Sequence, residues 1–210
     1  MSIAALAASN ENTQGHIVFT PAHLFLYGTG TTHLSLDLNH DGITDFDMTV
    51  TNIRYYGEGS DFAGGTLWDR PVAGNSALVR PLTKGAVIGS NGVFDGARDR
   101  MAWGRDVGHS GHGSYSTGGP WAGNAPNQYL GVRFLIDGEV HYGWIRVSVY
   151  TSVNEVSATI LGYAYNTVPN QSLKAGEGTE QPKAAAAHTA TLGVLALGAA
   201  FGGTKINFGL

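Results

Sequence analysis

Acidic and amide side chains occupy alternate positions in the short stretch 37–45, and this spacing is the most specific chemical pattern in the sequence. Gly42 follows the third of these side chains, where a sharply turning chain needs a residue without a Cβ atom. Calcium prefers oxygen ligands, and short loops supply them from alternating side chains and a main-chain carbonyl. The predicted calcium ligands are the side chains of Asp37, Asn39, Asp41 and Asp45 and the carbonyl of Ile43.

The residues on either side of this loop alternate in polarity, which is the period-two pattern of β-strands. Leucines occupy positions 34, 36 and 38, and Phe46, Met48 and Val50 alternate on the other side. The loop departs from an EF-hand, since Met48 stands where an EF-hand loop ends in glutamate. An Asx-rich hairpin turn without metal is the alternative interpretation. Calcium is favoured over it because three crowded carboxylates repel one another unless a cation offsets their charge.

The composition of the 210-residue chain is typical of an all-β protein. Hydrophobic residues make up 42% and charged residues 13%, and 31 glycines interrupt a sequence rich in aromatic and β-branched runs. We therefore predict an antiparallel β-sandwich, jelly-roll-like, with long glycine-rich loops and apolar terminal arms. The net charge of −4 gives no electrostatic reason to expect nucleic acid as a partner. The lack of cysteine in the sequence excludes disulfides and thiol catalysis.

Changes in composition along the chain divide it into four parts. Residues 1–11 are apolar and contain small residues, as in an N-terminal arm or the remnant of a secretory signal peptide. Residues 12–170 are expected to form the β-sandwich with the calcium hairpin, and residues 171–187 a linker. Residues 188–210 are an apolar Gly/Ala-rich tail, for which at most transient membrane contact is expected.

The segment from residue 129 to residue 150 predicts a β-hairpin. Val132, Phe134 and Ile136 alternate in its first arm, and Asp137-Gly138 fits a two-residue turn of the primed type. A further strand is expected over residues 156–165. The predicted core or near-core residues are Phe134, Ile136, Tyr142, Trp144 and Leu161.

Two glycine-rich segments, residues 57–76 and 90–127, are predicted to be irregular. Loops this long in a compact domain are often functional or pack against a neighbour. Three aromatic residues of the second segment, Trp103, Tyr115 and Trp121, are candidate contacts for a sugar ring or a partner protein. The alternative is that they cover the core of the sandwich.

A family resemblance becomes visible in the later strands. Residues 138–147 read GEVHYGWIRV, and residues 163–170 read YAYNTVPN after the strand segment Ala158-Thr159-Ile160. Together with the DxNxDGxxD pattern, these segments resemble secreted bacterial surface proteins of the PEP-CTERM-like kind over residues 15–175. The tail departs from that pattern, because no Pro-Glu-Pro precedes its apolar segment and no arginine cluster follows it. The resemblance implies an exported, β-rich surface or matrix protein without an assigned chemistry.

The sequence contains no GxSxG, HExxH, P-loop or dinucleotide-binding motif. Asp95, Asp99 and Asp106 could supply a carboxylate pair for glycoside hydrolysis, but solvated loop charges are the favoured interpretation. We therefore expect a protein without enzymatic activity, located outside the cell or on its outer surface.

Two functions from different classes follow from these observations. The first is a secreted, calcium-binding structural protein of the bacterial cell surface or extracellular matrix. Its terminal arms would add strands to the open sheet edges of neighbouring copies, which produces a homo-oligomer or a filament. The alternative is a carbohydrate-binding β-sandwich that presents Trp68, Trp103 or Trp121 to a polysaccharide.

Overall fold

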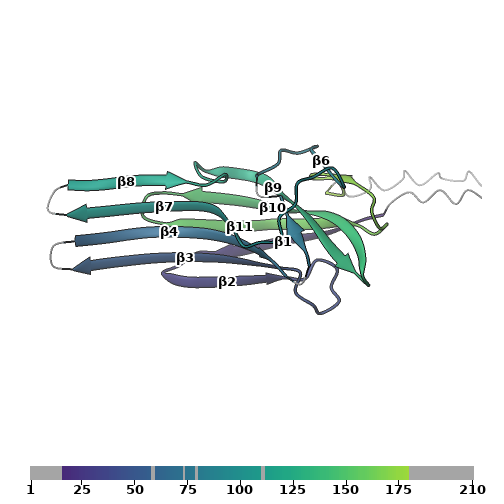
Figure 1. Ribbon diagram of the computed structural model, residues 1–210, viewed down its shortest axis with the longest axis horizontal. Coiled ribbons are helices and arrows are strands. Elements are labelled where there is room, and N and C mark those ends of the chain that lie inside the picture. The colour runs from purple at the N-terminus through teal and green to yellow at the C-terminus, as the bar shows by residue number, and fades with distance from the viewer. Residues whose placement is uncertain (1–15, 58–59, 73, 79, 110–111, 180–210) are drawn as a thin grey trace, which may run out of the picture. The chain divides into compact units, whose positions relative to one another are not determined.

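A computed structural model describes residues 16–57, 60–72, 74–78, 80–109 and 112–179. In this part of the chain the backbone forms two five-stranded sheets and one two-stranded sheet (Figure 1). The first sheet contains, in spatial order, β1 (Ile17–Leu26), β11 (Val156–Asn166), β10 (Glu139–Thr151), β9 (Ala125–Ile136) and β5 (Ser76–Ala77). The second contains β2 (Gly30–Leu36), β3 (Phe46–Gly57), β4 (Ser60–Pro71), β7 (Asp99–His109) and β8 (His112–Gly118). The small sheet pairs β6 (Val87–Ile88) with β12 (Leu173–Lys174).

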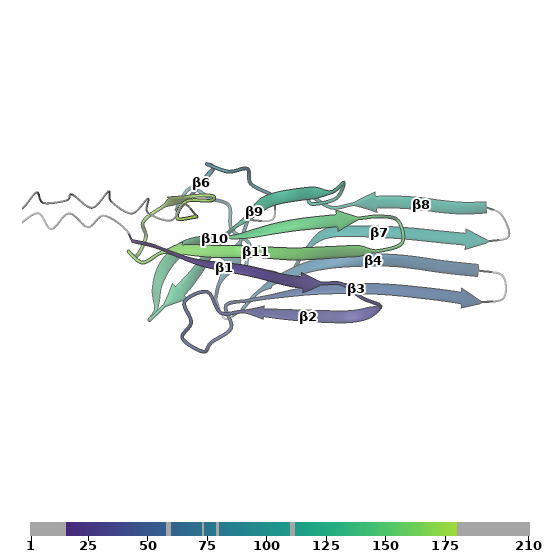
Figure 2. The same ribbon diagram turned by 180° about the vertical axis from the view of Figure 1, so that it is seen from behind.

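The predicted all-β fold and its antiparallel sandwich arrangement are confirmed, because the paired strands run antiparallel and the two large sheets share one core. The strand order does not confirm a jelly roll. In the second sheet β2, β3 and β4 are consecutive neighbours, and in the first sheet β9, β10 and β11 are (Figure 2). Among the described residues, no helix is long and apolar enough to cross a membrane.

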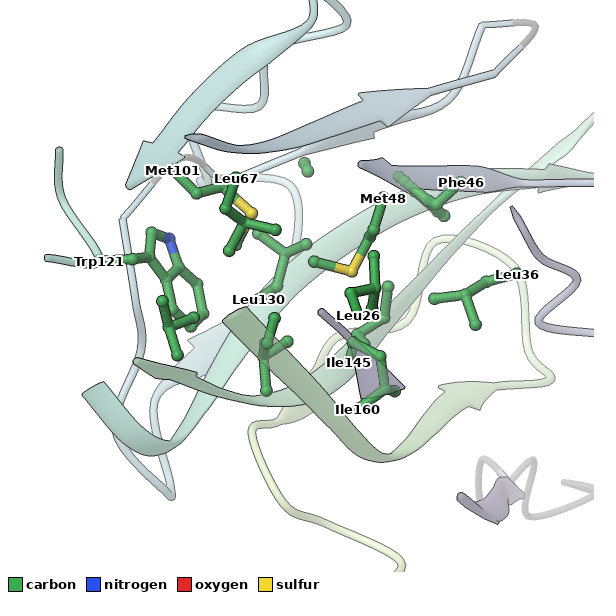
Figure 3. Close-up of a cluster of buried hydrophobic side chains, with 14 of the residues drawn as sticks. Leu26, Leu36, Phe46, Met48, Leu67, Met101, Trp121, Leu130, Ile145 and Ile160 are labelled. Carbon is green, nitrogen blue, oxygen red and sulfur yellow. The ribbon is translucent and has the colours of Figure 1, made fainter. Parts of the chain in front are cut away.

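Apolar residues from both sheets meet in the core between them (Figure 3). In β3, Phe46, Met48 and Val50 are fully buried, and the residues between them point to the opposite face of the sheet. Period-two alternation therefore decides which face of this strand enters the core. Further buried members of the cluster are Leu26, Leu36, Leu67, Met101, Trp121, Leu130, Ile145 and Ile160.

A second apolar cluster lies around Trp144 of β10, which is also fully buried. The Trp144 ring centroid lies 5.7 Å from that of Phe19 and 5.3 Å from that of Tyr129. The indole N–H of Trp144 donates a hydrogen bond of 3.2 Å to the carbonyl of Glu177. The chain beyond β11 thus satisfies the one polar group of a ring that is otherwise packed among apolar neighbours.

The segment after β11 extends the packed structure further than the sequence indicates. Leu173 and Ala175 are buried in the second cluster, although residues 171–187 are predicted to be a linker. The reason is that β12 pairs with β6. Each of these strands is only two residues long, and two residues are too few to show a strand pattern in the sequence. The predicted arms, residues 1–11 and 188–210, lie outside the described residues.

The hairpin of β9 and β10 has the predicted turn. Asp137 and Gly138 have φ angles of 52° and 83°, and Ile136 pairs with Glu139 across them. These are the positive angles that a two-residue primed turn requires. Phe134, Tyr142 and Trp144 are buried as predicted, whereas Ile136 and Leu161 are only partly buried.

Both segments predicted to be irregular contain long strands, so that prediction is wrong. β4 lies within the first segment, and the hairpin of β7 and β8 lies within the second. Glycine and polar residues have a weak intrinsic preference for strands. Here the ladder to β3, whose apolar face is buried, extends through β4 to β7 and β8 and supplies the stability that local preference lacks.

Asn52 of β3 links the two sheets through hydrogen bonds that imitate a strand ladder. Its Oδ1 accepts the N–H of Val156 at 2.8 Å, and its Nδ2 donates to the carbonyl of Val156 at 2.9 Å. Nδ2 also donates to the carbonyl of Gly28 at 3.0 Å. Gly65 makes room for this amide, because a Cβ atom at that position would overlap Asn52 Oδ1.

Gly104, the cross-strand partner of Gly65, allows a similar approach, since a Cβ atom there would overlap the carbonyl of Ser152. We expect Gly104→Ala to lower the free energy of unfolding by about 2 to 3 kcal/mol, because main chain must move to accommodate the methyl group. Gly108→Ala in the same strand is the control, since its nearest neighbour would lie 3.9 Å away. Urea denaturation measures both variants, and equal destabilisation would contradict this account.

Candidate functional site

The predicted calcium loop connects β2 and β3, and Asp37 organises its first half. One carboxylate oxygen of Asp37 accepts the backbone N–H groups of His40 at 2.7 Å and Asp41 at 3.2 Å. The other accepts the N–H of Gly42 at 2.8 Å. His40 and Gly42 have positive φ angles of 62° and 88°, which wrap the backbone around this carboxylate. Asp37 therefore shapes the first half of the loop.

Asn39 and Asp41 interact with each other inside the loop. The Nδ2 of Asn39 donates to Asp41 Oδ2 at 2.9 Å, and the N–H of Ile43 donates to Asp41 Oδ1 at 2.7 Å. The Oδ1 atom of Asn39 is buried and has no hydrogen-bond partner among the described residues. A buried amide oxygen without a donor is costly, and a cation is one partner that would satisfy it.

Asp45 is the last residue of the loop, and its side chain is buried, with only 4% exposed. Its Oδ2 accepts the N–H of Leu38 at 2.8 Å, and its Oδ1 accepts the Nδ2 of Asn75 at 3.2 Å. The pKa of this carboxyl is raised from 3.8 to about 6, mainly by burial. The two hydrogen bonds lower it, and the charges of Asp37 and Asp41 raise it. The loop is thereby anchored to the segment around Asn75.

Asn75 is a residue that the sequence reasoning missed. Besides Asp45 Oδ1, its Nδ2 contacts the backbone carbonyl of Asp45 at 3.1 Å, and its Oδ1 accepts the N–H of Leu135 at 3.1 Å. It is 7% exposed and stands 30 residues from the loop. The spacing of residues within the loop could not predict Asn75 as a partner of Asp45, because Asn75 comes from a different part of the chain.

The donor set of the loop fits a hard cation in its chemistry, since it offers carboxylate and amide oxygens and one buried oxygen without a partner. In the part of the chain that the structure describes, no three His, Cys, Asp or Glu side chains already stand together as a metal-holding group. The carboxylates of Asp37, Asp41 and Asp45 instead accept hydrogen bonds from the chain around them. Calcium therefore remains a prediction at this point.

The three aromatic residues predicted to contact a sugar or a partner differ in their burial. Trp121 is fully buried in the core, so its prediction as a contact residue is wrong. Figure 3 places its ring among the core side chains near Met101 and Leu67. Tyr115 of β8 is 65% exposed, and Trp103 of β7 is partly buried on the outer face of the second sheet. Sequence alone could not separate core from surface here, because the strands of Trp103 and Tyr115 and the burial of the turn that contains Trp121 depend on distant parts of the chain.

Arginines accompany the tryptophans on that outer face. The guanidinium carbon of Arg98 lies 4.5 Å from the Trp68 ring centroid. The guanidinium carbon of Arg100 lies 5.9 Å from Trp68 and 5.4 Å from Trp103. These distances are those of cation–π contacts, which hold both the rings and the charges in place.

Asp69 forms a second acidic site with two of the carboxylates considered in the sequence. It is 1% exposed, and its Oδ1 has no hydrogen-bond partner among the described residues. Burial, followed by the charges of Asp99 and Asp95, raises the pKa of Asp69 from 3.8 to about 7. Asp99 and Asp106 belong to β7 rather than to a loop, and Asp106 pairs with Ala63 away from this site.

Comparisons with known proteins add no assignment: no protein-family model, no curated protein and no solved structure matches the chain.

The raised pKa of Asp69 predicts a pH dependence of stability. The folded state holds the Asp69 proton more tightly than the unfolded state, so the free energy of unfolding should fall as the pH rises from about 4 to about 7. A shift from 3.8 to about 7 corresponds to on the order of 4 kcal/mol at most. Asp69→Asn should remove this component of the fall and be more stable than the wild type at pH 8.

Urea denaturation in calcium-free buffer at several pH values measures the effect. Asp61→Asn, which changes an exposed carboxylate of β4, is the control and should follow the wild-type profile. A difference between wild type and Asp69→Asn that stays constant from pH 4 to pH 8 would show that Asp69 does not titrate in this range.

Proposed function

We propose that this chain is an exported, calcium-stabilised structural protein of the bacterial cell surface or extracellular matrix, whose copies associate by β-strand addition. The proposal assigns no reaction to the protein. Its main support is one of the two edge strands of the second sheet, β8. The calcium loop supports it secondarily, because calcium is abundant outside cells and extracellular modules bind it weakly.

β8 is an edge strand without the usual features that prevent another strand from pairing with it. It pairs with β7 on one side, and no described strand pairs with its other side. Residues 113–117 are exposed, and the strand HGSYSTG contains no charged residue and no proline. Edges of soluble proteins are commonly protected by lysine, proline or bulges, since an open edge accepts a strand from another molecule.

β1, one of the two edge strands of the first sheet, offers a contrast within the same molecule. β1 contains Pro21, and its register to β11 shifts between Pro21 and Leu24. Proline and a bulge both obstruct the addition of another strand. Strand addition is therefore expected at β8 rather than at β1, with an apolar terminal arm of a neighbouring copy as the incoming strand.

The first prediction from this proposal concerns the metal. Calcium at about 100 times its Kd should raise the free energy of unfolding by about 2.7 kcal/mol. Asp41→Asn should bind calcium at least about tenfold more weakly, because it removes one negative charge from the loop. The substitution keeps an oxygen atom that can accept the Ile43 N–H, so the hydrogen bond that shapes the loop is retained. Calorimetric titration and thermal unfolding measure the two effects.

Asp137→Asn is the matched control, since it removes one carboxylate from the turn of a different hairpin. It should respond to calcium as the wild type does. Identical melting temperatures of the wild type in calcium and in chelator would rule out a stabilising calcium site in this loop.

The second prediction concerns assembly. The wild type should form oligomers or fibres in calcium at high protein concentration, as observed by sedimentation velocity and negative-stain microscopy. A Ser114→Lys, Ser116→Lys double variant should remain monomeric, because charges on an edge strand prevent strand addition while the side chains stay in water. Removal of residues 1–11 or residues 188–210 identifies the arm that supplies the incoming strand.

The control for this experiment places the same two charges elsewhere. Thr83 and Ser90 are exposed and lie outside the strands, so their replacement by lysine should leave assembly intact. A wild type that stays monomeric at high concentration with calcium present would refute the proposed association.

A further inference from the structure

We propose that the outer face of the second sheet binds an acidic polysaccharide, in a groove that crosses β3, β4 and β7 beside Trp103. This inference goes beyond the structural role proposed above and depends neither on calcium nor on self-association. It rests on the shape of the groove, on the aromatic and apolar groups beside its glycine floor and on the positive charges at its rim.

The register of the second sheet establishes which residues share this face. Thr51, Thr66 and Trp103 are partners across β3, β4 and β7. Their neighbours Val50 and Leu67, which are also partners, are fully buried in the core. Because successive side chains in a strand point to opposite faces, Thr51, Thr66 and Trp103 point away from the core.

A groove of about 290 Å³ lies on this face. Glycines form part of its floor: Gly64, Gly65 and Gly104 contribute only backbone. A Cβ atom at Gly64 would lie 3.2 Å from the Phe62 ring and 2.8 Å from the carbonyl of Gly104, so a side chain there would fill the groove. The residues that rise around this floor are Thr51, Ile53, Phe62, Thr66, Arg100, Trp103 and Arg105.

The rim of the groove carries positive charge that no carboxylate of the described residues pairs with. Arg100 and Arg105 line it and are exposed, and Arg98 lies over Trp68, the residue of β4 that pairs with Arg100. None of these three arginines forms an ion pair with a described residue, and no Asp or Glu lines the groove. Cation–π contacts hold Arg100 in place, which lowers the entropy that it loses when it binds an anion.

This combination fits a chain of sugar rings that carry carboxylates. The apolar face of a pyranose ring packs on aromatic and backbone surface such as that of Trp103, Phe62 and the glycine floor. A guanidinium group binds a carboxylate through two parallel hydrogen bonds, a geometry that an exposed arginine at the rim can supply. The hydroxyls of Thr51 and Thr66 offer further hydrogen bonds to sugar hydroxyls.

Nucleic acid fits the same surface less well. A nucleic acid strand brings one phosphate for each nucleotide, and its binding proteins are usually basic over the whole domain, whereas this chain has a net charge of −4. A few arginines beside an apolar groove match a ligand with spaced charges and rings between them. The acidic polysaccharide is therefore the occupant that the charge distribution favours.

Binding is tested with the full chain and two matched probes in the presence of chelator. One probe is a hyaluronan oligosaccharide of about ten sugars, in which every second sugar carries a carboxylate, and the other is the same oligosaccharide with its carboxylates reduced to alcohols. Isothermal titration should detect binding of the acidic probe and at least about tenfold weaker binding of the reduced one, since the arginine contacts need the charge. Equal affinity for both probes would overturn the assignment of an acidic ligand.

Variants of the groove assign the binding to this face. Trp103→Ala and an Arg100→Ala, Arg105→Ala double variant should each weaken binding of the acidic probe at least about tenfold. Circular dichroism and thermal unfolding verify their fold. If Trp103→Ala does not fold, Arg105→Glu provides the same test, because Arg105 is exposed and reversal of its charge leaves the core unchanged.

Two controls lie outside the groove. Arg70→Ala removes an arginine from the same face of the second sheet; Arg70 already forms an ion pair with Asp47, with 3.3 Å between Nη2 and Oδ2. Tyr150→Ala removes an exposed aromatic ring from the first sheet. Both should bind within about twofold of the wild type. If the control variants lose as much affinity as the groove variants, non-specific electrostatic or hydrophobic contacts explain the binding.

Single-stranded DNA with the same number of charges is the competing ligand. Tighter binding of this DNA than of the acidic probe would assign the groove to nucleic acid and overturn the proposal.

Discussion

The approach of the two sheets at Asn52 is the constraint on which much of this structure depends. The Asn52 amide occupies both the N–H and the carbonyl of Val156, so β3 of one sheet is tied to the start of β11 in the other. This is possible only because Gly65 leaves room for the amide. Such a buried amide is satisfied by fixed backbone groups, and it specifies one register between the layers where apolar packing alone would tolerate several.

Glycine in β4 and β7 has consequences on both faces of the second sheet. Toward the core, Gly65 and Gly104 admit Asn52 and the Ser152 carbonyl. On the outer face, Gly64 leaves the floor of the groove without side chains while Trp103 and Arg105 rise beside it. The same residues that weaken the intrinsic strand preference of this segment therefore also leave room for the groove on its outer face.

The loop of residues 37–45 combines local and distant interactions. Asp37 closes the turn through neighbouring backbone N–H groups, which requires only the residues of the loop itself. Asp45 is tied to the rest of the sandwich by Asn75, whose Nδ2 donates to Asp45 and whose Oδ1 accepts the N–H of Leu135. The arrangement of carboxylates in the loop is thus set partly by its own sequence and partly by a contact with a residue far along the chain.

The sequence by itself determined the features that local physics controls. The alternation in Phe46, Met48 and Val50 and the turn at Asp137-Gly138 depend on neighbouring residues, and the structure has them as predicted. Only the tertiary structure decided that glycine-rich segments form β4, β7 and β8, that Trp121 is core, and that Asn75 meets Asp45. These features come from pairing and burial between residues far apart in the chain, and such contacts leave no periodic pattern in a single sequence.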